Sequence, residues 1–132
     1  MNSKKQLGRE GELRFAAEFS RKGWNIFLPF GEDGAVDLLV EKEGEYKRIQ
    51  IKSTKCNNEV IMCRLKSSNN WQVKKYTSEE IDFFGIYDST NKKGYLINVK
   101  EVEGKIGINL RINKAKNNQT KNTRLAKEYE FF

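Results

Sequence analysis

Histidine is absent from the 132-residue sequence, and its absence removes several kinds of catalytic chemistry. Ser-His-Asp and Cys-His hydrolases, and the nucleases that depend on histidine, all need an imidazole as general base. Cysteine is scarce too. Cys56 and Cys63 do not form a Cys-x-x-Cys pair, so a cysteine and histidine zinc site is not expected. Any catalysis must therefore use carboxylates, lysines, tyrosines or a metal ion.

Long apolar runs are also missing. No stretch approaches the roughly 20 residues that span a bilayer. The N-terminal stretch MNSKKQLGREGE lacks the apolar core of a secretory signal. We therefore expect an intracellular protein, cytoplasmic or nucleoid-associated, with no membrane partner. Both cysteines are expected to be reduced, as small core or surface residues.

Acidic residues are outnumbered by basic ones. The 25 Lys and Arg against 18 Asp and Glu give a net charge of +7 and a pI near 9.4. This balance favours polyanionic partners, nucleic acid first and an anionic membrane second. A basic protein without such a partner is the alternative. The 37% hydrophobic and 33% charged fractions indicate a small core with a large charged surface.

A helix followed by several strands is the expected order of elements. The helix is expected at 5–22, ending at Gly23, with an apolar stripe of Leu13, Ala16, Ala17 and Ser20 and with Phe15 and Phe19 alongside. Strands are expected at 24–30, 35–42, 46–54, 59–65, 70–76, 83–89, 93–99 and 107–112. A capping box predicts a short helix at 77–84, residues 113–123 are expected as a loop, and 123–132 as a last helix or a docked tail. This order indicates one domain, residues 1–132, of α+β or mixed α/β class, with helices covering a central sheet.

In the hairpin expected at 35–54, the alternation of side chains between the two faces brings three polar residues to one face. Side chains two apart in a strand share a face. Asp37 thus faces away from the aliphatic residues next to it, and Gln50 and Lys52 face away from Ile51. If the two aliphatic rows coincide, Asp37 lies on the same face as Gln50 and Lys52. A carboxylate among aliphatic residues is costly to bury unless a metal ion or another cation lies beside it.

The expected helix supplies a further carboxylate. Glu12 lies four residues before Ala16 and seven before Phe19, so it borders the apolar side of the helix and can reach the sheet edge. Taken alone, Asp37 is more often a turn or salt-bridged residue, and Glu12 more often a surface group favoured by the helix dipole. Together with Gln50 and Lys52 they indicate a site.

An Asp on one strand, followed by an acid, any residue and a Lys on the next, is the signature of the PD-(D/E)XK nucleases, which the chain resembles over most of its length. The match is Asp37, then Gln50, Ile51 and Lys52, with Glu12 on the preceding helix. Val36 stands where the signature has proline, and Gln50 where it has an acid. The Gln-x-Lys form is similar to the branch that contains the group I intron-encoded homing endonucleases. The segments LPFGEDGAVDLLV, YTSEEIDFFGIYD and LRINKAKNNQ are similar to that branch as well.

This resemblance implies a restriction-endonuclease-like core and Mg²⁺-dependent hydrolysis of phosphodiester bonds in double-stranded DNA, with Mn²⁺ able to substitute. The implied catalytic residues are Glu12, Asp37, Gln50 and Lys52. The implied metal ligands are the side chains of Asp37, Gln50 and Glu12 and the backbone carbonyl of Ile51. Lys52 would stabilise negative charge on the attacking water and on phosphorus. Because Gln50 replaces an acid, we expect weaker affinity for the metal ion, or one ion rather than two.

A basic C-terminal segment, residues 111–127, contains six Lys and Arg and no acidic residue. It is either a solvated tail or a DNA-contacting segment, with Lys and Arg on phosphates and Asn and Gln on base edges. The expected DNA contacts are Lys4, Lys5, Arg9, Arg111, Lys114, Lys116, Asn117, Asn118, Gln119, Lys121 and Arg124. So short a nuclease would usually need more than one copy to cut both strands. The resemblance implies the same, so a homodimer or homotetramer is expected.

Other functions stay open at this point. Archaeal Holliday junction resolvases are similar in length, in the helical Glu and in the hairpin Asp, but they carry Glu where Gln50 stands. A DNA-binding protein with weakened catalysis is consistent with Gln50, and a restriction-type enzyme remains possible. The segment GIYDSTNKKGYLI superficially resembles the GIY-YIG nucleases, but a β-hairpin around STNKKG explains it without chemistry.

Overall fold

The computed structural model describes residues 3–31, 33–68, 73–113 and 123–132. Its first element is the helix α1 (Lys4–Arg21), which begins with a capping box. Ser3 Oγ accepts the Gln6 N–H, and Gln6 Oε1 accepts the Ser3 N–H. The helix is followed by Gly23, whose φ of 91° is the left-handed conformation that glycine adopts freely. The helix predicted at 5–22 is therefore confirmed.

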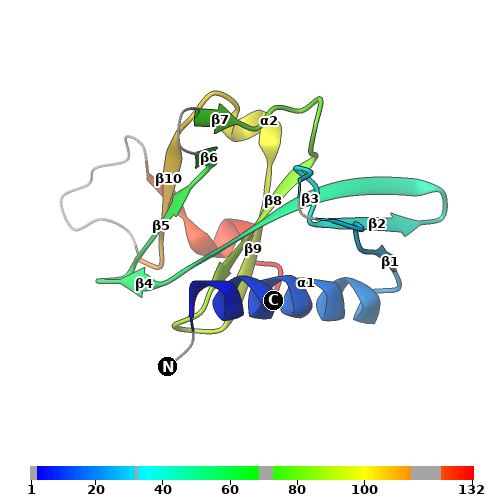
Figure 1. Ribbon diagram of the computed structural model, residues 1–132. Helices are drawn as coiled ribbons and strands as arrows, with labels where there is room; N and C mark the ends of the chain where they lie inside the picture. The colour runs from blue at the N-terminus through cyan, green and yellow to red at the C-terminus, as the bar shows by residue number, and fades with distance from the viewer. Residues whose placement is uncertain (1–2, 32, 69–72, 114–122) are drawn as a thin grey trace.

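A five-stranded mixed sheet forms the centre of the fold (Figure 1). In spatial order its strands are β1 (Asn25–Phe27), β2 (Leu38–Lys42), β3 (Glu45–Thr54), β8 (Phe83–Asp88) and β9 (Lys93–Asn98). Neighbouring strands are antiparallel except β3 and β8, which run parallel. The predicted hairpin of β2 and β3 is confirmed, and the segment GIYDSTNKKGYLI forms most of the β8–β9 hairpin.

The other strands make a second, four-stranded sheet and a separate pair. The second sheet has the order β11 (Thr123–Leu125), β10 (Gly107–Arg111), β5 (Val60–Arg64), β4 (Cys56–Asn57). The pair is β6 (Lys66–Ser68) with β7 (Val73–Lys75). A one-turn helix α2 (Val99–Val102) follows β9, and the 3₁₀ turn η1 (Ala126–Tyr129) follows β11. The sequence does not predict β4, β6, β11 or α2, which are too short to carry a periodic pattern.

Each face of the central sheet is covered by its own hydrophobic cluster. On one face, α1 packs Phe15 against the aliphatic row of the β2–β3 hairpin, which includes Leu38 and Ile49. The other cluster contains inward-facing residues of the second sheet, among them Ile61 and Leu110. Burying a side chain of this size contributes about 1.5–3 kcal/mol. The row of β3 that carries Gln50 therefore faces a second core and not bulk solvent.

The buried side of α1 differs from the predicted stripe. Leu13 is 61% exposed, and Ala17 and Ser20 are also exposed, whereas Phe15 and Phe19 are buried. A phenyl ring buries more apolar area than an alanine side chain. The helix therefore turns its two rings towards the sheet. Of the predicted stripe, only Ala16 packs against the same cluster, where it is partly buried, so the stripe is wrong for its other three residues.

The short helix predicted at 77–84 is also wrong. One turn forms, in which the Thr77 carbonyl accepts the Glu80 and Ile81 N–H groups at 3.0 and 3.2 Å. The helix does not continue, because the chain pairs with β3 from Asp82 onwards and becomes β8. The Asp82 N–H donates to the Arg48 carbonyl of β3 at 2.8 Å. Pairing with a central strand outweighs the local capping signal.

The C-terminal residues dock onto α1. This agrees with one of the two alternatives predicted for 123–132, a docked tail. The Phe132 ring meets the Phe15 ring edge-on at 5.1 Å between centroids, and Phe131 lies 4.5 Å from the Phe19 ring. The Phe131 N–H donates to the Gly94 carbonyl at 2.7 Å. Among the described residues, no helix is long and apolar enough to cross a membrane.

Candidate active site

β3 extends beyond its partner β2, and the candidate site forms at the edge that this leaves. The pairing of β2 with β3 ends at Leu38 and Ile49, whereas β3 continues to Thr54. Asp37 lies just beyond the last pair. Its N–H donates to the Ile49 carbonyl at 2.9 Å, and its Oδ2 accepts the Ile51 N–H at 2.9 Å. The Asp37 carboxylate therefore accepts the Ile51 N–H, a backbone group that would pair with β2 if β2 were longer.

The Ile51 carbonyl points to the same edge. In a strand, the N–H and C=O of one residue point to one side, and those of the next residue point to the other. The carbonyls of Arg48 and Thr54 accept N–H groups from Asp82 and Ser89, on the β8 side. The carbonyls of even-numbered residues thus face β8, and the Ile51 carbonyl faces Asp37.

Gln50 carries an unpaired buried oxygen. The residue is 8% exposed, and its Oε1 has no hydrogen-bond partner in the part of the chain that the structure describes. The register of the hairpin places Gln50 opposite Asp37 on the face of β3 that is turned away from α1. Leaving a buried acceptor unpaired costs about 1–3 kcal/mol. This oxygen is therefore a candidate ligand for a cation.

Glu12 approaches the edge because α1 lies very close to β3. Gly11 is buried, and a Cβ atom there would collide with Ser53 Oγ. Ser53 Oγ in turn donates to the Leu7 carbonyl of α1 at 3.0 Å. Next to this contact, Glu12 is close enough to Asp37 for the charge of Asp37 to raise the pKa of Glu12. The structure thus brings Glu12, which the sequence places beside the apolar helix face, to Asp37.

Burial governs the ionisation of both carboxyl groups. It raises the pKa of Asp37, and the Ile51 N–H and the Lys52 charge oppose this rise. Burial also raises the pKa of Glu12; the charge of Asp37 adds to the rise and that of Arg9 opposes it. Partly buried carboxyl groups that repel each other are typical of sites that bind a cation or catalyse a reaction.

Lys52 supplies a positive charge on the same face. Its register along β3 places it two residues after Gln50, and its charge acts on Asp37. Its Nζ lies 5.2 Å from the centre of the Tyr76 ring. The four residues predicted from the sequence, Glu12, Asp37, Gln50 and Lys52, are therefore gathered at one strand edge.

The oxygen atoms at this edge fit a hard divalent cation. Two carboxylates, one amide oxygen and one backbone carbonyl are the donor types that Mg²⁺ and Mn²⁺ accept. Within the described ranges, no three His, Cys, Asp or Glu side chains gather in a group that could hold a metal ion. The set at this edge therefore depends on the neutral Gln50 oxygen, which is buried and unpaired.

The expected DNA-contacting residues are spread over the fold. Lys4, Lys5 and Arg9 are exposed on the first half of α1. Arg111 is half-buried at the end of β10, and Arg124 of β11 donates to the Glu101 carbonyl at 3.3 Å. The remaining six lie outside the described residues: Lys114, Lys116, Asn117, Asn118, Gln119 and Lys121.

Sequence reasoning missed an ion pair that holds the strand carrying Gln50. The Asp82 carboxylate accepts the Arg48 N–H at 2.8 Å and two guanidinium N–H groups at 3.1 Å. The guanidinium also donates to the carbonyls of Ser78 and Glu79 at 2.9 and 2.7 Å. The turn before β8 is therefore fastened to β3. The sequence does show an Arg two residues before the Gln-x-Lys motif. Nothing local indicates its partner Asp82, which is 34 residues away in the chain.

Comparison with known proteins identifies the fold and the family of the chain. The solved structure of a bacterial homing endonuclease, I-Ssp6803I, is similar in fold, with a TM-score of 0.77 and 18% sequence identity over 98% of this chain and 89% of that one. No curated protein matches the chain in sequence. The sequence profile of the PD-(D/E)XK endonucleases matches residues 1–132, the entire chain. The protein with this strand edge belongs to the PD-(D/E)XK endonuclease family.

Proposed function

We propose that the protein is a metal-dependent endonuclease of the homing type, which hydrolyses phosphodiester bonds in double-stranded DNA. The observation that carries this proposal is the convergence of Glu12, Asp37, Gln50 and Lys52 at the open edge of β3. Membership of the family supports the reaction class. The similar fold of a bacterial homing endonuclease supports the homing type.

Four groups would hold the divalent ion, Mg²⁺ or in its place Mn²⁺. They are the carboxylates of Asp37 and Glu12, the amide oxygen of Gln50 and the carbonyl of Ile51. When bound, such an ion supplies Lewis-acid stabilisation of the negative charge on the phosphate. The Ile51 N–H keeps the Asp37 carboxylate at the edge, so little side-chain freedom is lost on binding.

Lys52 and Glu12 would act on the attacking water. The Lys52 ammonium would donate to the water or to a phosphate oxygen and so stabilise the negative charge that grows there. Glu12, whose pKa is raised by burial and by Asp37, would orient the water and accept a hydrogen bond from it.

DNA would be bound as a complex with more than one copy of the chain. The net charge of +7 favours a polyanion, and the exposed Lys4, Lys5 and Arg9 would contact phosphates. The basic segment 111–127 would extend this contact as part of the single domain, residues 1–132. A homodimer or homotetramer, working inside the cell, would bring one site to each strand.

A second candidate is a DNA-binding protein with weakened catalysis. The observation that favours it is the neutral amide of Gln50, which leaves two carboxylates among the proposed ligands. Weaker charge on the ligands lowers the affinity for a divalent ion.

Cleavage of genomic duplex fragments with Mg²⁺, and separately with Mn²⁺, tests the proposal. We expect cleavage that EDTA abolishes and that Asp37→Ala lowers at least about a hundredfold, as for loss of a group that stabilises the transition state. Asp33→Ala is the matched control, because Asp33 is an exposed acid in the same loop. Calorimetric titration with Mn²⁺ should show binding to the wild type that Asp37→Ala loses.

Each alternative has its own result. Undiminished cleavage by Asp37→Ala would contradict the proposed active site. Preference for a four-way junction over a long duplex would indicate a junction resolvase. Tight binding of duplex DNA without cleavage in either metal would support the second candidate.

A further inference from the structure

Lys52 is held by an aromatic ring and not by a carboxylate. Its Nζ lies 5.2 Å from the centre of the Tyr76 ring, and it forms no salt bridge in the described parts of the chain. A carboxylate partner would occupy the N–H donors of the ammonium and offset its charge. The face of a ring attracts a cation within about 6 Å and leaves those donors available. This difference matters for a lysine that has to meet a phosphate.

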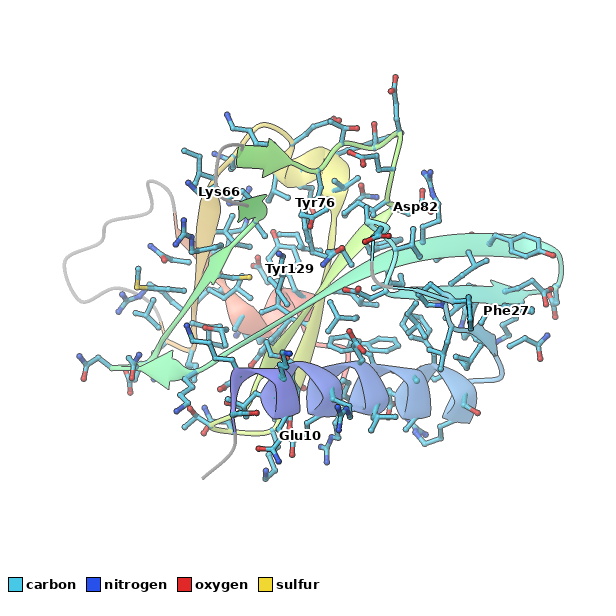
Figure 2. The ribbon with its side chains drawn as sticks, in the orientation of Figure 1. Glu10, Phe27, Lys66, Tyr76, Asp82 and Tyr129 are labelled. Atoms are coloured by element: carbon cyan, nitrogen blue, oxygen red, sulfur yellow. The ribbon has the colours of Figure 1, made fainter. Side chains whose placement is uncertain are left out.

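Tyr76 is itself firmly placed. It is 8% exposed, and its ring meets the Phe84 ring edge-on at 5.8 Å with an interplanar angle of 79°. Phe84 is the residue of β8 that lies beside Gln50 in the register of the sheet. Figure 2 shows Tyr76 on the opposite side of β3 and β8 from α1. One packed pair of rings therefore borders both Gln50 and Lys52.

We propose that Tyr76 is a positioning residue for the hydrolysis. Its ring face holds the Lys52 ammonium on the side of β3 that carries Gln50, while leaving the charge of Lys52 available for the phosphate. This inference rests on the proposed function, because it assigns a catalytic part to Lys52. Tyr76 does not touch the substrate and acts through Lys52 alone. Removing its ring should therefore lower kcat and leave the KM for DNA unchanged.

Nuclear magnetic resonance of lysine side chains tests the contact without any reaction. Protons above a ring face are shifted upfield, so the ε-protons of Lys52 should lie upfield of those of the exposed lysines. Lys52→Arg identifies the signal by its disappearance. The upfield shift should persist in Tyr76→Phe and vanish in Tyr76→Leu, which removes the ring but keeps an apolar side chain in the cluster.

Cleavage kinetics test the consequence. We expect Tyr76→Phe to keep kcat within about twofold and Tyr76→Leu to lower it about 2- to 30-fold at an unchanged KM, the range of a cation–ring interaction. Tyr95→Leu is the matched control. Tyr95 is a buried tyrosine of the same hydrophobic cluster, on β9, which β8 separates from β3. This control should lose stability but keep kcat and the Lys52 signal.

Three outcomes decide between the possibilities. A Lys52 signal at an ordinary position in the wild type overturns the inference even if Tyr76→Leu does not fold. Wild-type kcat in Tyr76→Leu overturns it as well, and leaves Tyr76 as a residue of the core. Absence of cleavage by the wild type overturns the proposed function, and with it the catalytic part of the inference, while the signal still reports the ring contact.

Discussion

At the scale of the residue, Gln50 determines the charge of the candidate site. An acid in its place would put a third carboxylate beside Asp37 and Glu12, whose pKa values are already raised by burial. The amide avoids that repulsion, so the chain is less dependent on a cation for its stability. The same exchange weakens the attraction for a divalent ion. Gln50 therefore favours folding of the free protein over affinity for the divalent ion that we propose to bind there.

The Arg48–Asp82 pair permits a prediction about pH. Hydrogen bonds and charge from Arg48 lower the pKa of Asp82. The unfolded chain therefore binds the proton more tightly, so the pair stabilises the fold above the unfolded carboxyl value near 4 and loses this effect as the pH falls through the lower folded value. We expect Asp82→Asn to reduce the free energy of unfolding by about 0.5–1 kcal/mol at pH 7, the range of a pair that solvent screens.

Urea unfolding of the wild type and of Asp82→Asn at pH 7 and at pH 3 checks this prediction. The difference between the two proteins should be clear at pH 7 and should shrink at pH 3. A difference that is equal at both values would show that the carboxylate charge of Asp82 does not contribute.

At the scale of the element, the close contact of α1 with the sheet positions Glu12. The contact depends on one glycine on each side of the interface. Gly11 lets α1 approach Ser53, and Gly85 on β8 leaves room for the side chains of Phe15 and Ile51. A small residue at such points allows two backbones to approach more closely than side chains would permit.

Gly85→Ala should therefore destabilise the protein. The new Cβ would lie 2.7 Å from Ile51 Cδ1 and 3.1 Å from atoms of the Phe15 ring. Overpacking of this kind costs about 1–3 kcal/mol. Gly8→Ala is the matched control within α1, where the new Cβ meets nothing within 4 Å. The control should gain about 0.5–1 kcal/mol, because alanine favours a helix over glycine.

Thermal or urea unfolding of the two alanine variants measures this contrast. Loss of stability in Gly8→Ala as well as in Gly85→Ala would mean that the effect comes from the glycine backbone and not from the space between α1 and β8. If Gly85→Ala also reduces DNA cleavage, we expect the cause to be displacement of Glu12 from the candidate site.

At the scale of the whole molecule, the chain closes on itself through its C-terminal residues. Phe131 and Phe132 pack against Phe15 and Phe19 of α1, and their N–H groups donate to the Gly94 carbonyl. Figure 1 shows the C-terminus beside α1. The C-terminal end thus joins the helix to β9. A Cβ at Gly94 would collide with the Phe132 ring, so this closure also depends on a glycine.

Phe132→Ala should lower the free energy of unfolding by about 2–3 kcal/mol. The change removes ring contacts with Phe15 and Tyr87 and the cation–ring contact with Arg14. Phe30→Ala is the control, because Phe30 is fully exposed and its loss should change stability by less than about 0.5 kcal/mol. Equal effects of the two changes in urea unfolding would contradict the docking of the C-terminal residues.

Local patterns in the sequence predict the parts of the site that depend on one strand or one hairpin. The alternation of side chains in β3 puts Gln50 and Lys52 on one face, and the β2–β3 pairing then brings Asp37 to them. A period of two residues is a property of the strand itself, so no distant contact can change it. The helix before the hairpin is predicted from its own apolar spacing and the glycine that follows it, whereas the restriction-endonuclease-like core follows from the family resemblance.

The tertiary structure decided what lies against that face. The side of α1 that is buried, the second core that covers Gln50, the Arg48–Asp82 pair and the ring of Tyr76 beside Lys52 all join residues far apart in the chain. Such contacts result from packing whole surfaces together, to which each local pattern contributes a small part. By itself the sequence determined which residues share a face, because that is set by the local geometry of the backbone. Only the tertiary structure decided which residues meet across faces, because burial of apolar area is shared by the entire fold.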